Sequence, residues 1–187
     1  MRMPLKSLWC CCLILGVAII PQLVLAQAAP PPDATAKLPS PPRKADVILS
    51  GATITVDYSA PSARGRTIFG GLVPYGEVWR TGANAATTLK TSSNLRIGDL
   101  SVPAGTYTLY SVPSADGWKL VVNKQTGQWG TVYNKAQDLG RTTMSVGSTS
   151  SPLETFVIDF EKTMGEKTEL HLKWAGVDAS VPVMVVK

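Results

Sequence analysis

The chain has 187 residues and a formal net charge of +5, from 18 Lys and Arg against 13 Asp and Glu. Its basic residues are scattered rather than gathered in a stripe, which argues against a nucleic-acid-binding protein. All three cysteines, Cys10 to Cys12, lie in the apolar N-terminal segment. A mature chain without that segment therefore has no disulfide, no thiol nucleophile and no zinc site built on thiolates.

The N-terminal segment has the pattern of a secretory signal peptide. A basic start is followed by the apolar run Leu8–Ile20 and by small residues at Ala26 and Ala28. The apolar run is shorter than the roughly 18 residues of a membrane span, which disfavours the alternative of an uncleaved anchor. The sequence predicts a signal peptide over residues 1–28, cleaved after Ala26 or Ala28, and export to the periplasm or the outside of the cell.

A proline-rich segment follows the predicted cleavage site. Residues 29–44 contain six prolines among Ala, Ser and Lys, a composition that stays extended and buries little apolar surface. We predict a linker there. The remaining residues, 45–187, are enough for a single domain that buries roughly two-thirds of its unfolded surface.

The domain shows apolar residues with a period of two and no sustained helical spacing. Apolar and polar residues alternate through Thr53–Tyr58 and Glu169–Trp174. Further strands are predicted at Val78–Thr81, Thr87–Thr91, Leu95–Ile97, Leu100–Val102, Thr106–Val112, Trp118–Asn123, Thr142–Val146, Leu153–Phe160 and Ser180–Val186. About ten short strands without a long helix predict an all-β fold, an antiparallel, jelly-roll-like β-sandwich of two sheets.

The segment PSARGRTIFGGLVPYGEVWRTGAN, residues 61–84, is the part of the domain that core packing explains least. Arg80 precedes a turn that ends at Asn84. The guanidinium, the Asn84 amide and backbone N–H groups of the turn can bind one carboxylate or phosphate. In the alternative interpretation Arg80 pairs with an internal carboxylate, such as Asp57 or Glu77, and braces the turn.

Two further features accompany this turn. Arg66, followed by Gly70 and Gly71, predicts either a flexible basic rim over the site or a long ordered loop. Among the aromatic residues, Trp118 and Trp174 are predicted to lie in the interior. Trp129 lies in a Gly-rich loop and is the ring that we expect to contact a ligand.

Catalytic and metal chemistry find little support in the residue types. His171, the sole histidine, alternates with Leu170 and Leu172 and is predicted to face solvent. With no second histidine and no cysteine in the mature chain, neither a metal nor a cofactor is indicated. Carboxylates such as Asp138 and Asp159 are available for acid–base catalysis, but no pattern brings two of them together.

Three segments of the domain resemble a known protein family. They are DYSAPSARGRTIFGGLVPYGEVWRTGANAATT at Asp57–Thr88, LSVPAGTYTLYSVPSADGWKLVVNKQTGQWGT at Leu100–Thr131 and LETFVIDF at Leu153–Phe160. With them the chain resembles the bacterial secreted family DUF2911, whose name assigns no activity. Ala60 and Ala85 stand where members of that family often have Arg and Glu. The resemblance therefore implies that a shared function rests on residues such as Arg66, Trp79, Arg80 and Asn84.

These observations favour a non-catalytic module of the cell envelope. We expect it to bind a small anionic or sugar-like ligand through Arg66, Trp79, Arg80, Asn84 and Trp129. One alternative is a structural or protein-interaction domain whose partner is another envelope protein. The other is a hydrolase that depends on carboxylates and arginine. No nucleic-acid partner and no membrane span after signal cleavage are expected.

Overall fold

Nine β-strands pair into one antiparallel sheet in the order β1-β2-β3-β6-β7-β8-β9-β4-β5. A computed structural model describes residues 39–186 of the chain. The strands are β1 Pro42–Leu49, β2 Ala52–Ser59, β3 Thr87–Thr91, β4 Leu95–Ile97, β5 Leu100–Val102, β6 Gly105–Val112, β7 Trp118–Asn123, β8 Asp138–Met164 and β9 Lys167–Val185. The single helical element within these residues is the 3-10 turn η1, Lys135–Gln137.

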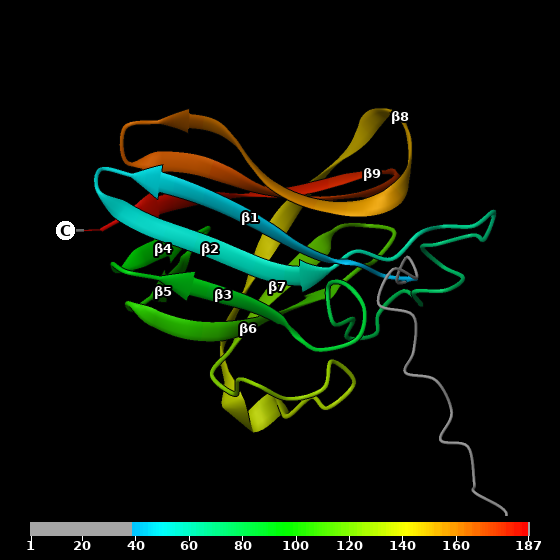
Figure 1. Cartoon of the computed structure of the whole chain (residues 1–187), viewed down its shortest axis with the longest axis horizontal. Coiled ribbons are helices and arrows are strands. Elements are labelled where there is room, and N and C mark those ends of the chain that lie inside the picture. Colours follow the sequence, from blue (N-terminus) through cyan, green and yellow to red (C-terminus); the bar gives the residue numbers. More distant parts are fainter. Residues whose placement is uncertain (1–38, 187) are drawn as a thin grey trace, which may run out of the picture. The chain divides into compact units, whose positions relative to one another are not determined.

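The prediction of an all-β antiparallel fold without a long helix is confirmed for the described residues. The hydrogen-bonded strands form one continuous sheet rather than two separate sheets, because β8 pairs with both β7 and β9. Residues 138–144 of β8 pair with β7, and residues 145–164 pair with β9. In the view of Figure 1 the hairpin of β8 and β9 lies above β1 and β2.

Several strand boundaries differ from the prediction. The segments 142–146 and 153–160 belong to the single strand β8, and the segments 169–174 and 180–186 fall largely within β9. The predicted strand Val78–Thr81 is reduced to one isolated bridge between Trp79 and Ser111. At the N-terminal side β1 begins at Pro42, inside the segment that composition assigned to the linker.

The core is one cluster of buried side chains to which strands from distant parts of the sheet contribute. Ile54 and Val56 of β2 share one buried cluster with Phe156 of β8 and Trp174 of β9. The Tyr58 hydroxyl accepts a hydrogen bond from the Ile158 backbone N–H at 3.0 Å, which fastens β2 to β8. The chain leaves the sheet at the end of β2, next to Tyr58, and continues into the site described below.

The predicted signal peptide and most of the predicted linker lie outside the described residues. Within residues 39–186 no helix has the length and apolar character needed to cross a membrane.

Candidate functional site

A cavity of about 480 Å³ lies between the connection that joins β2 to β3 and the loop after β7. Tyr110 of β6 and Trp174 of β9 also contribute to its lining. The cavity is lined by Ser40, Pro61, Arg66, Leu72, Val73, Val78, Trp79, Arg80, Gly82, Ala83, Asn84, Tyr110, Gly130, Thr131, Tyr133 and Trp174. We call it the Arg80 pocket. It brings together four of the predicted site residues, namely Arg66, Trp79, Arg80 and Asn84, and no Asp or Glu is among its lining residues.

Arg80 reaches the pocket as a half-buried side chain without a partner. Its Nε atom is buried and has no hydrogen bond, and no ion pair within residues 39–186 involves its guanidinium. The pairing with Asp57 or Glu77 that the alternative interpretation requires is therefore absent among these residues. Asp57 is instead engaged by Lys90 at 2.9 Å and by Lys44 at 4.0 Å.

The stem of Arg80 is held by the loop after β7. Gly130 packs so closely that a Cβ atom built on it would lie 2.4 Å from Arg80 Cδ. The Gly130 backbone N–H also donates to the Asn84 carbonyl at 3.0 Å. Only glycine allows this approach of the loop to the turn, so the position of the guanidinium is set by backbone packing.

The turn after Arg80 is tied down by buried hydroxyl groups. Thr81 Oγ1 donates to Ser111 Oγ at 3.0 Å, and Thr87 Oγ1 donates to the Thr81 carbonyl at 2.7 Å. Gly82 passes so near β2 that a Cβ atom there would lie 2.9 Å from the Ser59 carbonyl oxygen. The turn is a rigid support for Arg80.

Asn84 closes one side of the pocket in a left-handed conformation, with φ of 59°. Its side-chain Nδ2 donates to the Ser40 carbonyl oxygen at 3.3 Å. Ser40 thereby becomes part of the pocket wall, although sequence reasoning placed it in the linker.

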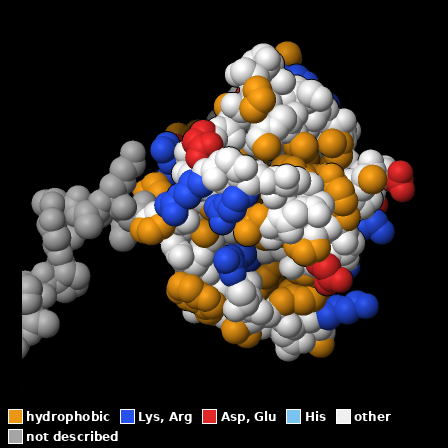
Figure 2. Space-filling view, turned by 90° about the vertical axis from the view of Figure 1, so that its right-hand side faces the viewer, with side chains coloured by type: hydrophobic (Ala, Val, Ile, Leu, Met, Phe, Trp, Pro, Cys, Tyr) orange, Lys and Arg blue, Asp and Glu red, His pale blue; other side chains and the backbone are white. Residues whose placement is uncertain are grey.

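Arg66 supplies a second positive charge. Its Nε donates to the Ala63 carbonyl at 2.9 Å and its Nη2 to the Ser62 carbonyl at 2.7 Å, so its charge is hydrogen-bonded but not neutralised by a carboxylate. The following residues 67–73 are connected by short-range backbone hydrogen bonds. These bonds favour the ordered loop over the flexible rim. Figure 2 shows Lys and Arg side chains gathered near the middle of the face that includes these loops.

Aromatic rings form the back of the pocket. Trp79 stacks on Trp174 with ring centroids 5.9 Å apart and contacts the edge of Phe156 at 5.0 Å. Tyr110 and Tyr133 meet edge to face at 4.9 Å on the other side. Trp79 is thus half-buried and serves as a wall rather than as an exposed stacking surface.

The hydroxyl groups of both tyrosines are already occupied. The Tyr110 hydroxyl donates to the Val132 carbonyl at 2.8 Å and accepts from Gln128 at 3.1 Å. The Tyr133 hydroxyl donates to Asp138 at 2.6 Å. Burial raises the pKa of the Tyr133 phenol, and the Asp138 carboxylate raises it further, so the phenol stays protonated at neutral pH.

Asp138 lies behind Tyr133, outside the lining of the pocket. Its carboxylate also pairs with Arg141 at 3.1 Å. This acid is committed to a structural network and does not project a free carboxylate into the Arg80 pocket.

Trp129 does not line the pocket, although its ring is 56% exposed. It forms an isolated bridge with Ala85, directly before Gly130. Trp118 and Trp174 are 2% and 1% exposed, so the prediction that they lie in the interior is confirmed.

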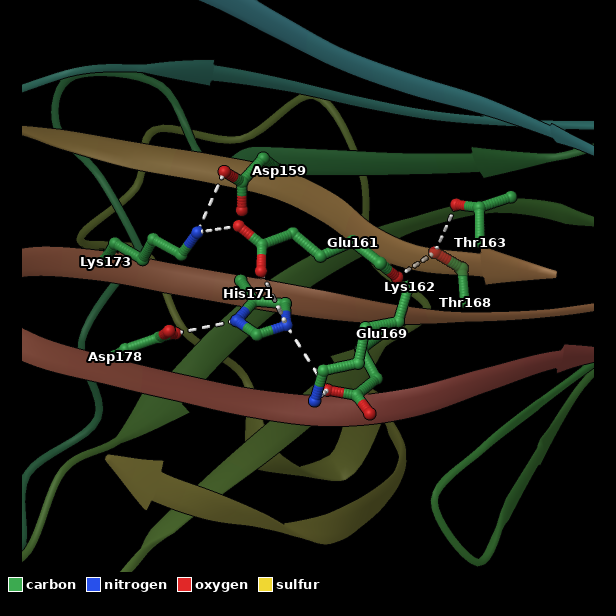
Figure 3. Close-up of polar contacts among 9 residues, drawn as sticks. All are labelled: Asp159, Glu161, Lys162, Thr163, Thr168, Glu169, His171, Lys173 and Asp178. Carbon is green, nitrogen blue, oxygen red and sulfur yellow. Dashed lines mark hydrogen bonds and ion pairs between the residues drawn. The ribbon is translucent and has the colours of Figure 1, made fainter. Parts of the chain in front are cut away.

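A second polar cluster lies on β8 and β9, and it corrects the prediction for His171. The residue is only 4% exposed and does not face solvent. Figure 3 shows its ring between Asp178 on one side and Glu161 and Glu169 on the other. Its Nδ1 lies 2.8 Å from Asp178 Oδ1, and its Nε2 lies 3.3 Å from Glu169 Oε2.

The reason for this burial is a kink in β9. Ala175 has a φ of 51°, and the register with β8 shifts on both sides of it. The kink brings Asp178 back over His171, which a regular alternation cannot anticipate. Lys173 hydrogen-bonds both Glu161 and Asp159 in the same cluster. Within residues 39–186 no group of His, Cys, Asp and Glu has an arrangement suited to a metal ion.

Comparison with known proteins identifies one family. The model of DUF2911, described as a protein of unknown function, matches residues 40–183. The matched region begins at the pocket residue Ser40 and includes every other residue of the Arg80 pocket. No curated protein and no solved structure matches the chain.

Proposed function

We propose that this chain, which belongs to the DUF2911 family of proteins of unknown function, is a non-catalytic module that binds a small anionic or sugar-like ligand in the Arg80 pocket. The predicted signal peptide supports a location in the cell envelope, either in the periplasm or outside the cell. The family name assigns no activity, so the proposal rests on the pocket itself.

The observation that carries the proposal is the unpartnered guanidinium of Arg80. Its Nε atom is buried without a hydrogen bond, in a pocket whose lining contains a second arginine and no carboxylate. Buried polar groups are nearly always hydrogen-bonded in folded proteins. A carboxylate, phosphate or sulfate group in the pocket would accept from the planar fork of Arg80 and supply the missing partner.

The pocket gives less support to a hydrolase. Glycoside hydrolysis requires two facing carboxyl groups, and neither Asp nor Glu lines the cavity. The structural alternative has one observation in its favour, because Arg66 is bonded to two backbone carbonyls and can brace the loop that contains it. That alternative predicts a stability role for the arginines without ligand binding.

We also propose that the curled sheet corresponds to the predicted jelly-roll-like sandwich of two sheets. The support is that Val56 of β2 and Trp174 of β9 belong to the same buried cluster, although they come from different layers. In this architecture the Arg80 pocket opens at one end of the sandwich, where loops from both layers meet.

Thermal unfolding with a panel of anions and sugars tests the proposed function. A ligand at 100 times its dissociation constant stabilises a protein by about 2.7 kcal/mol, which raises the melting temperature by several degrees. The variant Arg80→Gln should lose this shift. The matched control Arg96→Gln, which removes an exposed arginine outside the pocket lining, should keep it.

The outcome that contradicts binding is equally specific. If no compound raises the melting temperature and Arg80→Gln unfolds several degrees below the wild type, Arg80 is a structural brace. A shift that persists in Arg80→Gln would place the ligand elsewhere on the protein.

A further inference from the structure

The size of the Arg80 pocket restricts the ligand class. Its volume of about 480 Å³ lies in the range of pockets that bind organic molecules of drug size. An inorganic anion would contact Arg80 and leave most of this space to water. The cavity is therefore suited to an acid group with a sizeable body attached.

The walls around Arg80 indicate the character of that body. The apolar lining that a ligand can reach consists of Leu72, which is exposed, and of the half-buried Val78, Trp79 and Tyr133. Val73 and Tyr110 also line the pocket but are almost fully buried. Leu72 is 46% exposed, so part of this apolar lining faces solvent when the pocket is empty. Flat apolar groups bind well against aromatic side chains, because burial of their surface is favourable and rings pack in offset or edge-to-face geometry.

The polar groups of the lining argue against a sugar body. The hydroxyls of Tyr110 and Tyr133 are engaged inside the protein, and the Asn84 amide donates to Ser40. The uncharged side-chain partners left in the lining are the hydroxyls of Ser40 and Thr131. A sugar brings more hydroxyl groups than these two can bond, and each buried hydroxyl left unpaired weakens binding. Arg80 Nε is the one buried side-chain polar atom of the lining that has no hydrogen bond among the described residues.

We infer that the Arg80 pocket binds an organic acid with a flat, mainly apolar body, such as an aromatic carboxylate, in preference to a sugar acid or an inorganic anion. This inference rests on the proposed function of the same pocket. In this proposal the carboxylate lies against Arg80, and the body lies against Leu72 and the half-buried rings of Trp79 and Tyr133.

Isothermal titration calorimetry of the purified protein with five probes tests the inference. The probes are 2-naphthoate, its neutral amide, acetate, glucuronate and inorganic phosphate. We expect 2-naphthoate to bind about ten-fold to a hundred-fold more tightly than acetate, phosphate or glucuronate, because it buries an aromatic ring in addition to its charge. We also expect its amide to bind at least about ten-fold more weakly, because a charge-assisted hydrogen bond to Arg80 is lost.

Two variants separate the acid contact from the apolar contact. Arg80→Gln should remove the preference for naphthoate over its amide. Leu72→Ala should weaken naphthoate several-fold and leave acetate unchanged, whereas Val132→Ala, which truncates an exposed apolar side chain outside the lining, should change neither. Thermal melts of each variant establish that it is folded.

The possible failures differ from one another. If all the anions bind with similar affinity and all depend on Arg80, or if glucuronate binds most tightly, the inference is wrong and the proposed anion site survives. If no probe binds, or if binding is unaffected by Arg80→Gln, both the inference and the proposed function are overturned.

Discussion

Replacing Gly130 by alanine should disturb the support of Arg80 in a predictable way. The added Cβ atom would lie 2.4 Å from Arg80 Cδ and 2.7 Å from the Asn84 carbonyl oxygen. The Arg80 stem can move, but the oxygen belongs to the backbone and accepts the Gly130 N–H bond of 3.0 Å. Overpacking of this kind costs about 1–3 kcal/mol. A middle value of about 2 kcal/mol lowers the melting temperature of a domain of this size by roughly 4–8 °C.

Circular dichroism melts of Gly130→Ala and of a control glycine variant measure this effect. The control is Gly176→Ala, since Gly176 lies in β9 and has no heavy atom within 4 Å of an added Cβ. Its stability should stay within about 0.5 kcal/mol of the wild type or rise slightly. The Gly130 variant should also bind the anions of the Arg80 pocket more weakly, since Arg80 must shift. A Gly130→Ala protein that melts and binds like the wild type would refute the idea that this glycine positions Arg80.

Three further predictions concern the core and the cluster on β8 and β9. Tyr58→Phe should destabilise the protein by about 1–3 kcal/mol in denaturant unfolding, because it leaves the buried Ile158 N–H without its acceptor; an unchanged midpoint would contradict this. Phe156→Ala should lower the free energy of unfolding by about 3–5 kcal/mol, as expected when a fully buried ring is removed. A decrease below about 1 kcal/mol would mean that neighbouring side chains fill the space left by the ring. The hydrogen bond from Lys173 holds the pKa of Glu161 below its usual value. That stabilisation is present above about pH 4.3, the unfolded value, and is lost as the pH falls through the lower folded pKa. Melting temperatures measured from about pH 5 to about pH 3 should therefore fall less steeply in Lys173→Met than in the wild type, and equal slopes would refute the coupling.

The sequence predicted the short strands well and the long ones poorly. The bounds of β3, β4, β5 and β7 agree with the prediction. Buried and more exposed residues alternate in β3, β4 and β5, whereas β7 is a run of mostly buried residues. β8 and β9 were divided into shorter strands, because their register shifts and kinks interrupt the alternation without ending the strand. The same irregularity misplaced His171, whose burial depends on a residue seven positions further along the kinked strand.

The sequence singled out pocket residues whose polar groups are close together in the chain. Arg80 and Asn84 stand at the two ends of one turn, so their guanidinium and amide groups were expected to face the same ligand. Tyr110 and Tyr133 were missed as pocket residues because strand pairing and the loop after β7, not sequence proximity, bring them to Arg80. Gly130 stands in a Gly-rich loop, but the sequence does not show that this glycine leaves room for the turn between Arg80 and Asn84.

The backbone around Arg80 indicates why this turn is built as it is. Thr81 and Asn84 both have positive φ, at 51° and 59°, and a β-branched residue rarely adopts this conformation. Such residues cost of order 1–3 kcal/mol each and persist only where the surrounding structure enforces them. Here buried hydroxyl bonds to Ser111 and from Thr87 enforce the turn, yet the guanidinium they support has no partner. A structural brace is expected to have its arginine hydrogen-bonded, so a fixed Arg80 without a partner supports the proposed binding site.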